Sequence, residues 1–230
     1  MSFRFIGLLL AALLLGGCAT RQEPIPLSKD YYSARTSRIG VLVAELPKPD
    51  TSFPGAGCLL CIAVASAAHG ALTDAVRTWP TTDLQPLKGE LVQLLQSRSQ
   101  QAVPIDEATA LTALPNRSGH EAGFAVKDFS SVATRAGVDR LLVVSVHPFG
   151  LGVWRNYSAY IPTGAPYAVF KASAFIVDMK SHRLDWYQDF NVTQPAEGAW
   201  DEPPKFPGLA NAHFQVMELG KDAIKKALTP

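Results

Sequence analysis

Short apolar runs of strand length, separated by segments with helical periodicity, most constrain how this chain folds. The run "RIGVLVAELP", residues 38–47, is almost continuously apolar and ends at Pro47, which predicts a strand buried on both faces. "QAVPI", residues 101–105, and the run Leu141–Val146 predict a second and a third strand. Strands without a polar face must be covered on both sides, so these runs favour a sheet inside a domain.

Two helices are predicted between these strands. The first follows a cap at Thr82 or Asp83 and carries leucines at helical spacing on one face. These leucines are Leu84, Leu87, Leu91, Leu94 and Leu95. The second helix is capped by Asp128 and ends at Gly137, a residue type that closes helices in the left-handed conformation.

The later part of the chain predicts an antiparallel hairpin and a final helix. Residues 167–179 and 183–193 flank a polar turn, and alternate residues of the second strand predict one buried face. That face consists of Leu184, Trp186, Phe190 and Val192. The final helix is predicted to bury Ala212, Val216, Leu219, Ala223 and Ala227. The order of elements predicts an α/β fold of two or three layers, with helices packed on a mixed sheet of about five strands.

The first residues have the pattern of a bacterial signal peptide. Arg4 precedes an apolar run that is too short to span a membrane, and "LGGC", residues 15–18, resembles a lipobox. This resemblance implies cleavage before Cys18 and acylation of Cys18, and Ala19 in place of Asp favours the outer membrane. The expected division is a signal peptide at residues 1–17, a lipidated flexible tether at 18–37 and a single periplasm-facing domain at 38–230.

Two short motifs carry a resemblance to a known group. Residues 137–139, Gly-Val-Asp, end a helix before an apolar strand, and Val177-Asp178 precedes a hairpin that contains Leu184 and Trp186. This pattern resembles the periplasmic α/β domains of the curli-secretion lipoprotein CsgG, the amino-terminal domain of TolB and related envelope lipoproteins. Their usual Thr-Gly turn is replaced here by residues 180–183. The resemblance implies an assembly, secretion or scaffold component of the envelope, and no enzyme.

The charge balance excludes one class of partner. The chain has 21 Lys and Arg against 20 Asp and Glu, a formal net charge of +1, which gives no electrostatic case for nucleic-acid binding. We expect it to contact the membrane through its lipid anchor and to bind envelope proteins or further copies of itself. No P-loop, dinucleotide fingerprint or G-x-S-x-G motif is present, and no cofactor is expected.

Cys58 and Cys61 are the two cysteines besides Cys18, and they begin the apolar run "CLLCIAVASAAHGAL". If the run is helical, residues three apart lie close enough for a disulfide. Three interpretations stay open: a structural disulfide or buried thiols, thiol–disulfide chemistry, and a segment that contacts a membrane or subunit. Leu59 and Leu60 are expected to bury the pair. The small residues Ala63, Ala67, Gly70 and Ala71 are expected to pack in the core, or else at a subunit interface.

The histidines do not predict a metal site. His69, His120, His147, His182 and His213 are scattered, and Cys58, Cys61 and His69 together lack a fourth zinc ligand. No metal is expected.

A long Gly/Pro-containing loop before the hairpin is the best candidate for a partner-binding surface. It contains residue types that are enriched at binding hot spots, although single aromatic residues near strand ends more commonly pack under a sheet edge. These residues are Trp154, Arg155, Tyr157, Tyr160 and Tyr167. We therefore expect a non-enzymatic envelope lipoprotein that binds proteins. The alternatives are a thiol–disulfide protein that uses Cys58 and Cys61, and an oligomeric secretion-pore subunit.

Overall fold

The computed structural model describes residues 22–34, 37–98, 100–106, 109–119 and 121–229. The expected signal peptide, Cys18 and His120 lie outside these ranges.

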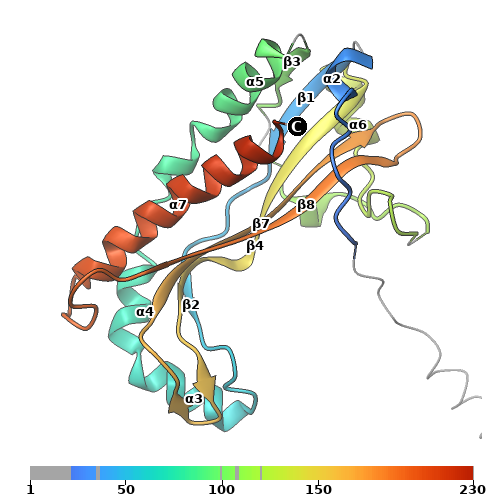
Figure 1. The fold of residues 1–230 in the computed structure, drawn as a ribbon. Coiled ribbons are helices and arrows are strands. Elements are labelled where there is room, and N and C mark those ends of the chain that lie inside the picture. Colours follow the sequence, from blue (N-terminus) through green and yellow to red (C-terminus); the bar gives the residue numbers. More distant parts are fainter. Residues whose placement is uncertain (1–21, 35–36, 99, 107–108, 120, 230) are drawn as a thin grey trace, which may run out of the picture.

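A mixed six-stranded sheet forms the framework of the domain (Figure 1). The strands of this sheet are β1 (Arg38–Val43), β2 (Asp50–Ser52), β3 (Gln101–Pro104), β4 (Arg140–Trp154), β7 (Tyr167–Asp178) and β8 (Leu184–Pro195). The strands β5 (Tyr157–Ser158) and β6 (Ile161–Pro162) form a separate short hairpin. The strand order is β3-β1-β4-β7-β8, and β2 pairs with the far end of β4. β1 is parallel to β3 and β4, whereas β7 is antiparallel to β4 and β8. The predicted α/β class with a mixed sheet is confirmed.

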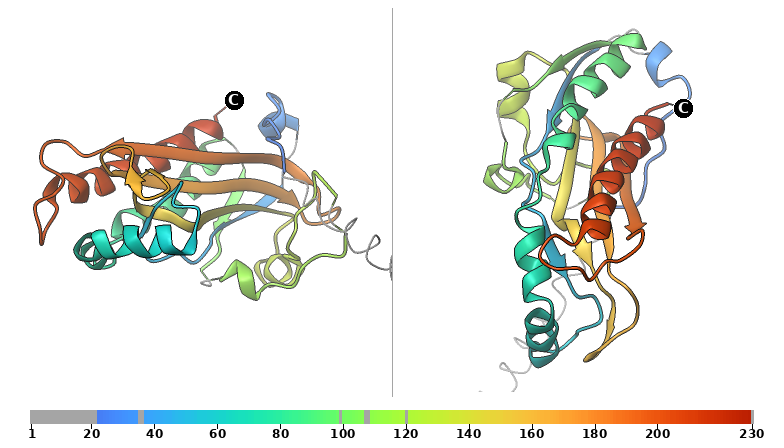
Figure 2. Two further views of the ribbon diagram at one scale, coloured as in Figure 1. Left: turned by 90° about the horizontal axis from the view of Figure 1, so that it is seen from below. Right: turned by 90° about the vertical axis from the view of Figure 1, so that its left-hand side faces the viewer.

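Helices cover the two faces of the sheet unequally. They are α2 (Tyr31–Ala34), α3 (Leu59–Ala68), α4 (Gly70–Val76), α5 (Leu87–Ser97), α6 (Ser130–Ala136) and α7 (Pro207–Ala227), with 3-10 turns at Thr82–Leu84 and Leu111–Ala113. The larger core packs α5 and α7 against one face, and the smaller core packs α6 against the other. Figure 2 shows the long α7 lying along the sheet.

The predicted helices between the strands are present. Leu84, Leu87, Leu91 and Leu95 are buried, which confirms most of the leucine face. The carboxylate of Asp128 accepts a 2.9 Å hydrogen bond from the backbone of Ser130, and Gly137 closes α6 with φ 62°. These signals of α6 therefore act as expected, but the expected cap of the first helix at Thr82 or Asp83 is wrong. Thr82 and Asp83 lie in the 3-10 turn, and α5 begins at Leu87 after Pro86, without a side-chain cap.

Two expected core residues lie elsewhere, for different physical reasons. A register shift between Ile176 and Val177 moves Leu184 to the smaller core, away from the Trp186 face. In α7, Leu219 is exposed because Gly220 faces the sheet, where a Cβ would overlap the ring of Phe170. The close approach of α7 to the sheet thus determines which face of α7 is buried, because only glycine fits at the point of contact.

Part of the expected flexible tether lies against the domain. Ile25 forms an antiparallel bridge with Tyr187 of β8, and the backbone N–H of Gly123 donates to Oε1 of Gln22 at 2.7 Å. Further along, Tyr31 is buried, and the hydroxyl of Tyr32 donates to the carbonyl of Leu228 at 2.7 Å. Apolar and aromatic residues thus attach a segment whose composition is otherwise that of a linker.

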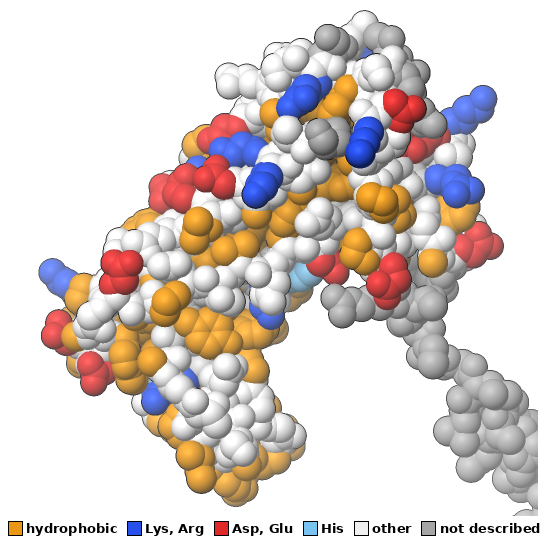
Figure 3. Space-filling model, in the orientation of Figure 1, with side chains coloured by type: hydrophobic (Ala, Val, Ile, Leu, Met, Phe, Trp, Pro, Cys, Tyr) orange, Lys and Arg blue, Asp and Glu red, His pale blue; other side chains and the backbone are white. Residues whose placement is uncertain are grey.

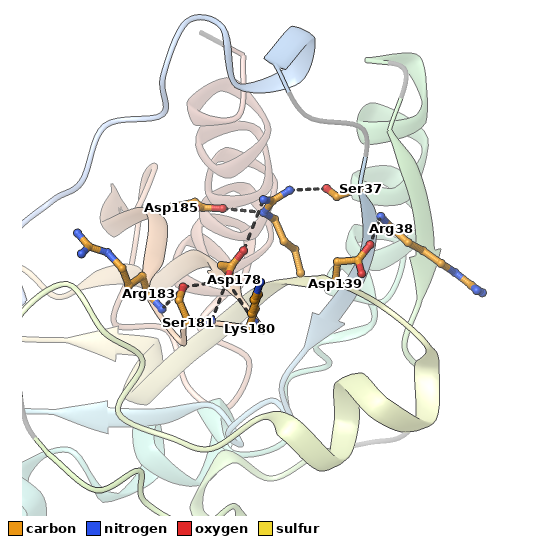
Figure 4. Close-up of polar contacts among 9 residues, drawn as sticks. Ser37, Arg38, Asp139, Asp178, Lys180, Ser181, Arg183 and Asp185 are labelled. Atoms are coloured by element: carbon orange, nitrogen blue, oxygen red, sulfur yellow. Dashed lines mark hydrogen bonds and ion pairs between the residues drawn. The ribbon is translucent and has the colours of Figure 1, made fainter.

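A buried arginine joins this entry segment to the sheet (Figure 4). Arg140, the first residue of β4, is 7% exposed. Its Nε donates to Asp185 at 2.8 Å, its Nη1 donates to the hydroxyl of Ser37 at 2.6 Å, and its Nη2 lies 3.5 Å from Asp178. Burial opposes ionisation of Asp178, but hydrogen bonds from Ser181 and the charge of Arg140 outweigh it and lower the pKa of this carboxyl. The cluster connects β4, β7, β8 and the start of β1.

Replacing Arg140 with Met should lower the free energy of unfolding by about 3 kcal/mol, because Asp178 and Asp185 lose their counter-charge in a partly buried site. Denaturant titration measures this loss. Lys180→Ala, an exposed change in the adjoining turn, is the control and should stay within about 0.5 kcal/mol of the wild type. Equal losses in the two variants would contradict this role of Arg140.

Candidate functional site: the lobe at the end of the sheet

A lobe extends beyond the end of β4 and is the most distinct surface feature of the domain (Figures 1 and 2). We define the lobe as residues 50–77 and 155–166; it contains β2, α3, α4 and the β5–β6 hairpin. β2 attaches it to the sheet by parallel pairing with Gly152–Trp154. The lobe is therefore a continuation of the central strand.

Two glycines permit the close backbone packing at the base of the lobe. Gly152 has φ +132°, and a Cβ there would overlap the backbone of Asp50. Gly55 has φ +87°, and a Cβ there would overlap the carbonyl of Tyr157. The N–H of Tyr157 donates to the carbonyl of Pro54 at 2.7 Å, so the two halves of the lobe are joined through their main chains.

His69 joins the helical half of the lobe to the hairpin half. Its Nε2 lies 2.8 Å from the hydroxyl of Tyr157 and 3.0 Å from Nη1 of Arg155. A guanidinium can only donate, so Nε2 is an acceptor and the imidazole is neutral. Burial, followed by the charge of Arg155, lowers the pKa of His69. The ring also stacks on Phe53, with centroids 5.5 Å apart.

Cys58 and Cys61 form a disulfide in the structure, as one of the sequence interpretations predicted. Cys61 is buried against Ala65 and Tyr157, whereas Cys58 is exposed. Sγ of Cys58 also accepts a 3.0 Å hydrogen bond from the N–H of Cys61 and thereby caps α3. The disulfide closes the first turn of the helix.

The expectation that α3 is a core helix is wrong. Leu59 is 89% exposed and Leu60 is 62% exposed, so they do not bury the cysteine pair. The small residues Ala63, Ala67 and Ala71 are exposed as well. Among the residues of α3, only Cys61 and Ala65 are buried, because the lobe supports the helix from one side. An apolar composition on every face had indicated burial, but the fold supplies no second layer here.

The end of the lobe is apolar and without charge. Residues 51–73 and 156–170 contain no Asp, Glu, Lys or Arg. The apolar tip, as we call it, projects from these segments and consists of Leu59, Leu60, Val64, Tyr160 and Ile161. Figure 3 shows hydrophobic side chains gathered at the end of the lobe.

A groove of about 590 Å³ runs along the flank of the lobe beside β2. Its lining combines apolar side chains with charged and hydroxyl groups: Asp50, Thr51, Ser52, Phe53, Ala56, Ile62, Ser66, Gly70, Thr73, Asp74, Arg77 and Phe149. Nε and Nη2 of Arg77 donate to the two carboxylate oxygens of Asp50 at 3.1 and 3.2 Å. The groove therefore differs chemically from the apolar tip.

Phe149 reaches the groove from a bulge in β4. The register shifts between Val146 and Leu151, and Phe149 is 57% exposed with φ 57°. Its carbonyl accepts a 2.9 Å hydrogen bond from Nε1 of Trp154, and Gly150 packs too closely on the backbone of β7 to carry a side chain. A bulky residue in the left-handed region is uncommon and costs free energy. Phe149 was not predicted from the sequence, because Gly150 beside it is compatible with a bulge but does not by itself indicate one.

The five residues expected to form a partner surface do not lie on one surface. Tyr157 is 8% exposed and belongs to the interior of the lobe. Arg155 stacks over the ring of Trp200, and Trp154 is covered by the ammonium group of Lys171, 3.6 Å from the ring centroid. Tyr167 donates a 3.1 Å hydrogen bond to Asn156, and Tyr160 is exposed at the apolar tip.

The described residues contain neither a candidate metal site nor a single helix that could span a membrane. Within them, no cluster of three His, Cys, Asp or Glu side chains is placed to hold a metal ion. No single described helix has the length and apolar character to cross a membrane; α3 and α4 reach these values together, but with a bend of 75° between them.

Comparisons with known proteins do not assign a family. No protein-family model matches the chain, and no curated protein sequence is significantly similar to it. Similar solved structures include protein XCC0632 of Xanthomonas campestris, described with the family model DUF330, at 12% identity and a TM-score of 0.41 over 90% of this chain and 94% of that one. Lipoprotein GNA1162 of Neisseria meningitidis is 12% identical, with a TM-score of 0.29 over 84% and 99% of the two chains. Hypothetical protein CT253 of Chlamydia trachomatis is 6% identical, with a TM-score of 0.36 over 84% and 98%. The resemblance to CsgG and TolB stays an expectation.

Replacing both Cys58 and Cys61 with Ser should lower the free energy of local unfolding of α3 by about 2 kcal/mol. This is the stabilisation that chain entropy assigns to a disulfide closing so short a loop. Hydrogen exchange of the α3 amides measures this opening. Ser66→Ala, on the exposed side of the same helix, is the matched control and should leave the exchange rates unchanged. Unchanged exchange in the double variant would show that packing alone fixes α3.

His69 should titrate below the ordinary histidine pKa of about 6.5. Because its folded-state pKa is lowered, its contribution to stability is complete above the unfolded-state pKa and is lost as the pH falls through the folded-state pKa. NMR of the His69 ring protons measures the pKa directly. In His69→Gln, the loss of stability that comes from protonation of His69 at low pH should disappear. A normal pKa for His69 would contradict the acceptor role of Nε2.

Proposed function

We propose that this protein is a lipid-anchored, non-enzymatic component of the bacterial envelope that acts in assembly, secretion or scaffolding by binding another protein in the groove of its lobe. Cys18 is the anchored residue, the outer membrane is the location, and residues 38–230 act as one periplasm-facing domain. The observation that carries the proposal is Phe149, a large aromatic residue exposed in the groove on a conformationally costly bulge. Local strain that a fold maintains at one exposed residue points to a function for that residue.

The chemistry of the groove suits a protein partner. Phe53, Ile62 and Phe149 offer apolar contacts, while Asp74 and Arg77 lie among the polar groups that line it. Such a mixture of an aromatic centre and polar groups is typical of protein interfaces, where one buried aromatic residue often provides most of the affinity. We therefore assign Phe149 as the central contact.

The test replaces Phe149 while its backbone conformation is kept. Asn tolerates a positive φ, so Phe149→Asn should fold with unchanged stability but lose the aromatic contact. A photo-crosslinking amino acid at position 62, in the groove, should capture one discrete envelope protein in cells, and Phe149→Asn should weaken that capture by about 30-fold, equivalent to about 2 kcal/mol. The same amino acid at exposed Gln93 on α5 is the control and should capture nothing. Equal capture at the two positions would refute a specific partner site.

A second candidate function is thiol–disulfide exchange. It is favoured by the exposure of Cys58 within a disulfide at the first turn of a helix, a position that stabilises a thiolate. Cys58→Ser with Cys61→Ser should abolish oxidation of a dithiol substrate if this is the activity, because the Cys58–Cys61 disulfide takes up the two electrons and two protons of that reaction. Capture from position 62 should persist in this variant if the protein is a scaffold.

A further inference from the structure

We propose that the apolar tip enters the headgroup and acyl-chain boundary of the same bilayer that holds the lipid at Cys18, so that the protein contacts the membrane at two separated points. This inference rests on the lipid anchor of the proposed function. It assigns to the tip an occupant different from that of the groove.

The composition of the tip matches a lipid surface. Leu59 and Ile161, from opposite halves of the lobe, are 89% and 69% exposed, and neither half carries a charge near them. Tyr160 adds a side chain with an apolar ring and a polar end, the type that is favoured at membrane interfaces. Charged groups begin at the base of the lobe, with Asp50, Asp74 and Arg77. Insertion into the bilayer is therefore favourable for the tip alone, because deeper insertion would bring the charged groups at the base of the lobe out of water.

The local backbone is prepared for shallow insertion. The N–H of Cys61 donates to Sγ of Cys58, and the N–H of Ile62 donates to the carbonyl of Cys58, so these two groups in the first turn of α3 have internal partners. Tyr157 and Ser158 pair with Ile161 and Pro162 in the hairpin. Paired backbone groups lower the cost of leaving water. The 75° bend between α3 and α4 favours a surface position over a spanning one.

The length of chain before the described structure places the domain beside the bilayer. Three residues separate Cys18 from Gln22, and Gln22 and Ile25 are fixed to the domain through Gly123 and Tyr187. A chain of this length reaches about 14 Å at most. The domain thus has little freedom to move away from an acylated Cys18.

The geometry of the domain lets the tip reach the same surface. The described chain starts near the β7–β8 turn, and β7, with 12 residues, spans about 40 Å from there to the lobe. In Figure 1 the start of the described chain and the lobe both lie on the lower side of the sheet, at its two ends. The end of the lobe projects from the rest of the domain in Figure 3, so a bilayer surface can reach it. These features together favour lipid over a second copy or another protein.

The test uses the full-length acylated protein in vesicles of phosphatidylethanolamine and phosphatidylglycerol. With Cys18 acylated and Cys58 bonded to Cys61, Ile161→Cys introduces one free thiol at the tip, which is labelled with an environment-sensitive fluorophore. Gln93→Cys on α5 provides the matched control. We expect the emission at position 161 to shift to the blue and to be quenched by nitroxide-labelled acyl chains, with neither effect at position 93. Adding Leu59→Ser and Leu60→Ser should abolish both effects while the protein still floats with the vesicles.

Each other outcome has one meaning. If the wild-type protein does not float with vesicles, the anchor of the proposed function fails, and this inference fails with it. If it floats but position 161 behaves like position 93, the tip inference alone is overturned. If the blue shift appears without lipid and grows with protein concentration in the Cys18→Ser protein, the tip is covered by a second copy. If the shift requires an added envelope protein, a protein covers the tip.

Discussion

The ion pairs and hydrogen bond of the Arg140 guanidinium fix the strand on which the rest of the molecule depends. They hold the start of β4 to Asp178, Asp185 and Ser37, and thereby join the central strand, the hairpin and the entry segment. A buried charge tolerates few alternative arrangements, because each of them leaves it unpaired. β4 then runs for 15 residues to Trp154 and carries β2, and with it the lobe, at its other end. A polar cluster at one end of the sheet therefore helps to position the candidate site at the other end.

The lobe separates two kinds of surface that lie next to each other. The groove has Asp50, Asp74 and Arg77 among its lining, whereas the apolar tip has no charged residue. Polar groups around an apolar centre allow a choice between protein partners, because a wrong partner leaves them unpaired. A surface without polar groups, such as the apolar tip, discriminates little between partners. It suits a lipid bilayer, which has no fixed shape. The two proposed occupants therefore follow from one difference in charge placement.

The sequence was most informative where local rules and tertiary packing agree. The strand runs, the leucine face of α5, the ends of α6 and the hairpin followed from periodicity and capping. Leu184 was misplaced because a register shift has no signal in an alternating pattern. The exposure of α3 was missed because its apolar composition says nothing about what covers it. Phe149 was missed because a bulge appears only when the two paired strands are known. The candidate site is thus the part of the chain where local patterns inform least.

The bridge between Ile25 and Tyr187 has a consequence for the behaviour of the protein among its own copies. β8 is the last strand of the sheet, and an open strand edge is a template on which identical chains can stack. The entry segment occupies part of this edge with two hydrogen bonds, of 2.9 and 3.1 Å. Proteolytic loss of this segment would uncover an aggregation-prone edge. If Cys18 carries the proposed lipid, the same cut would also release the protein from the membrane. The amino-terminal segment therefore also protects the colloidal stability of the domain.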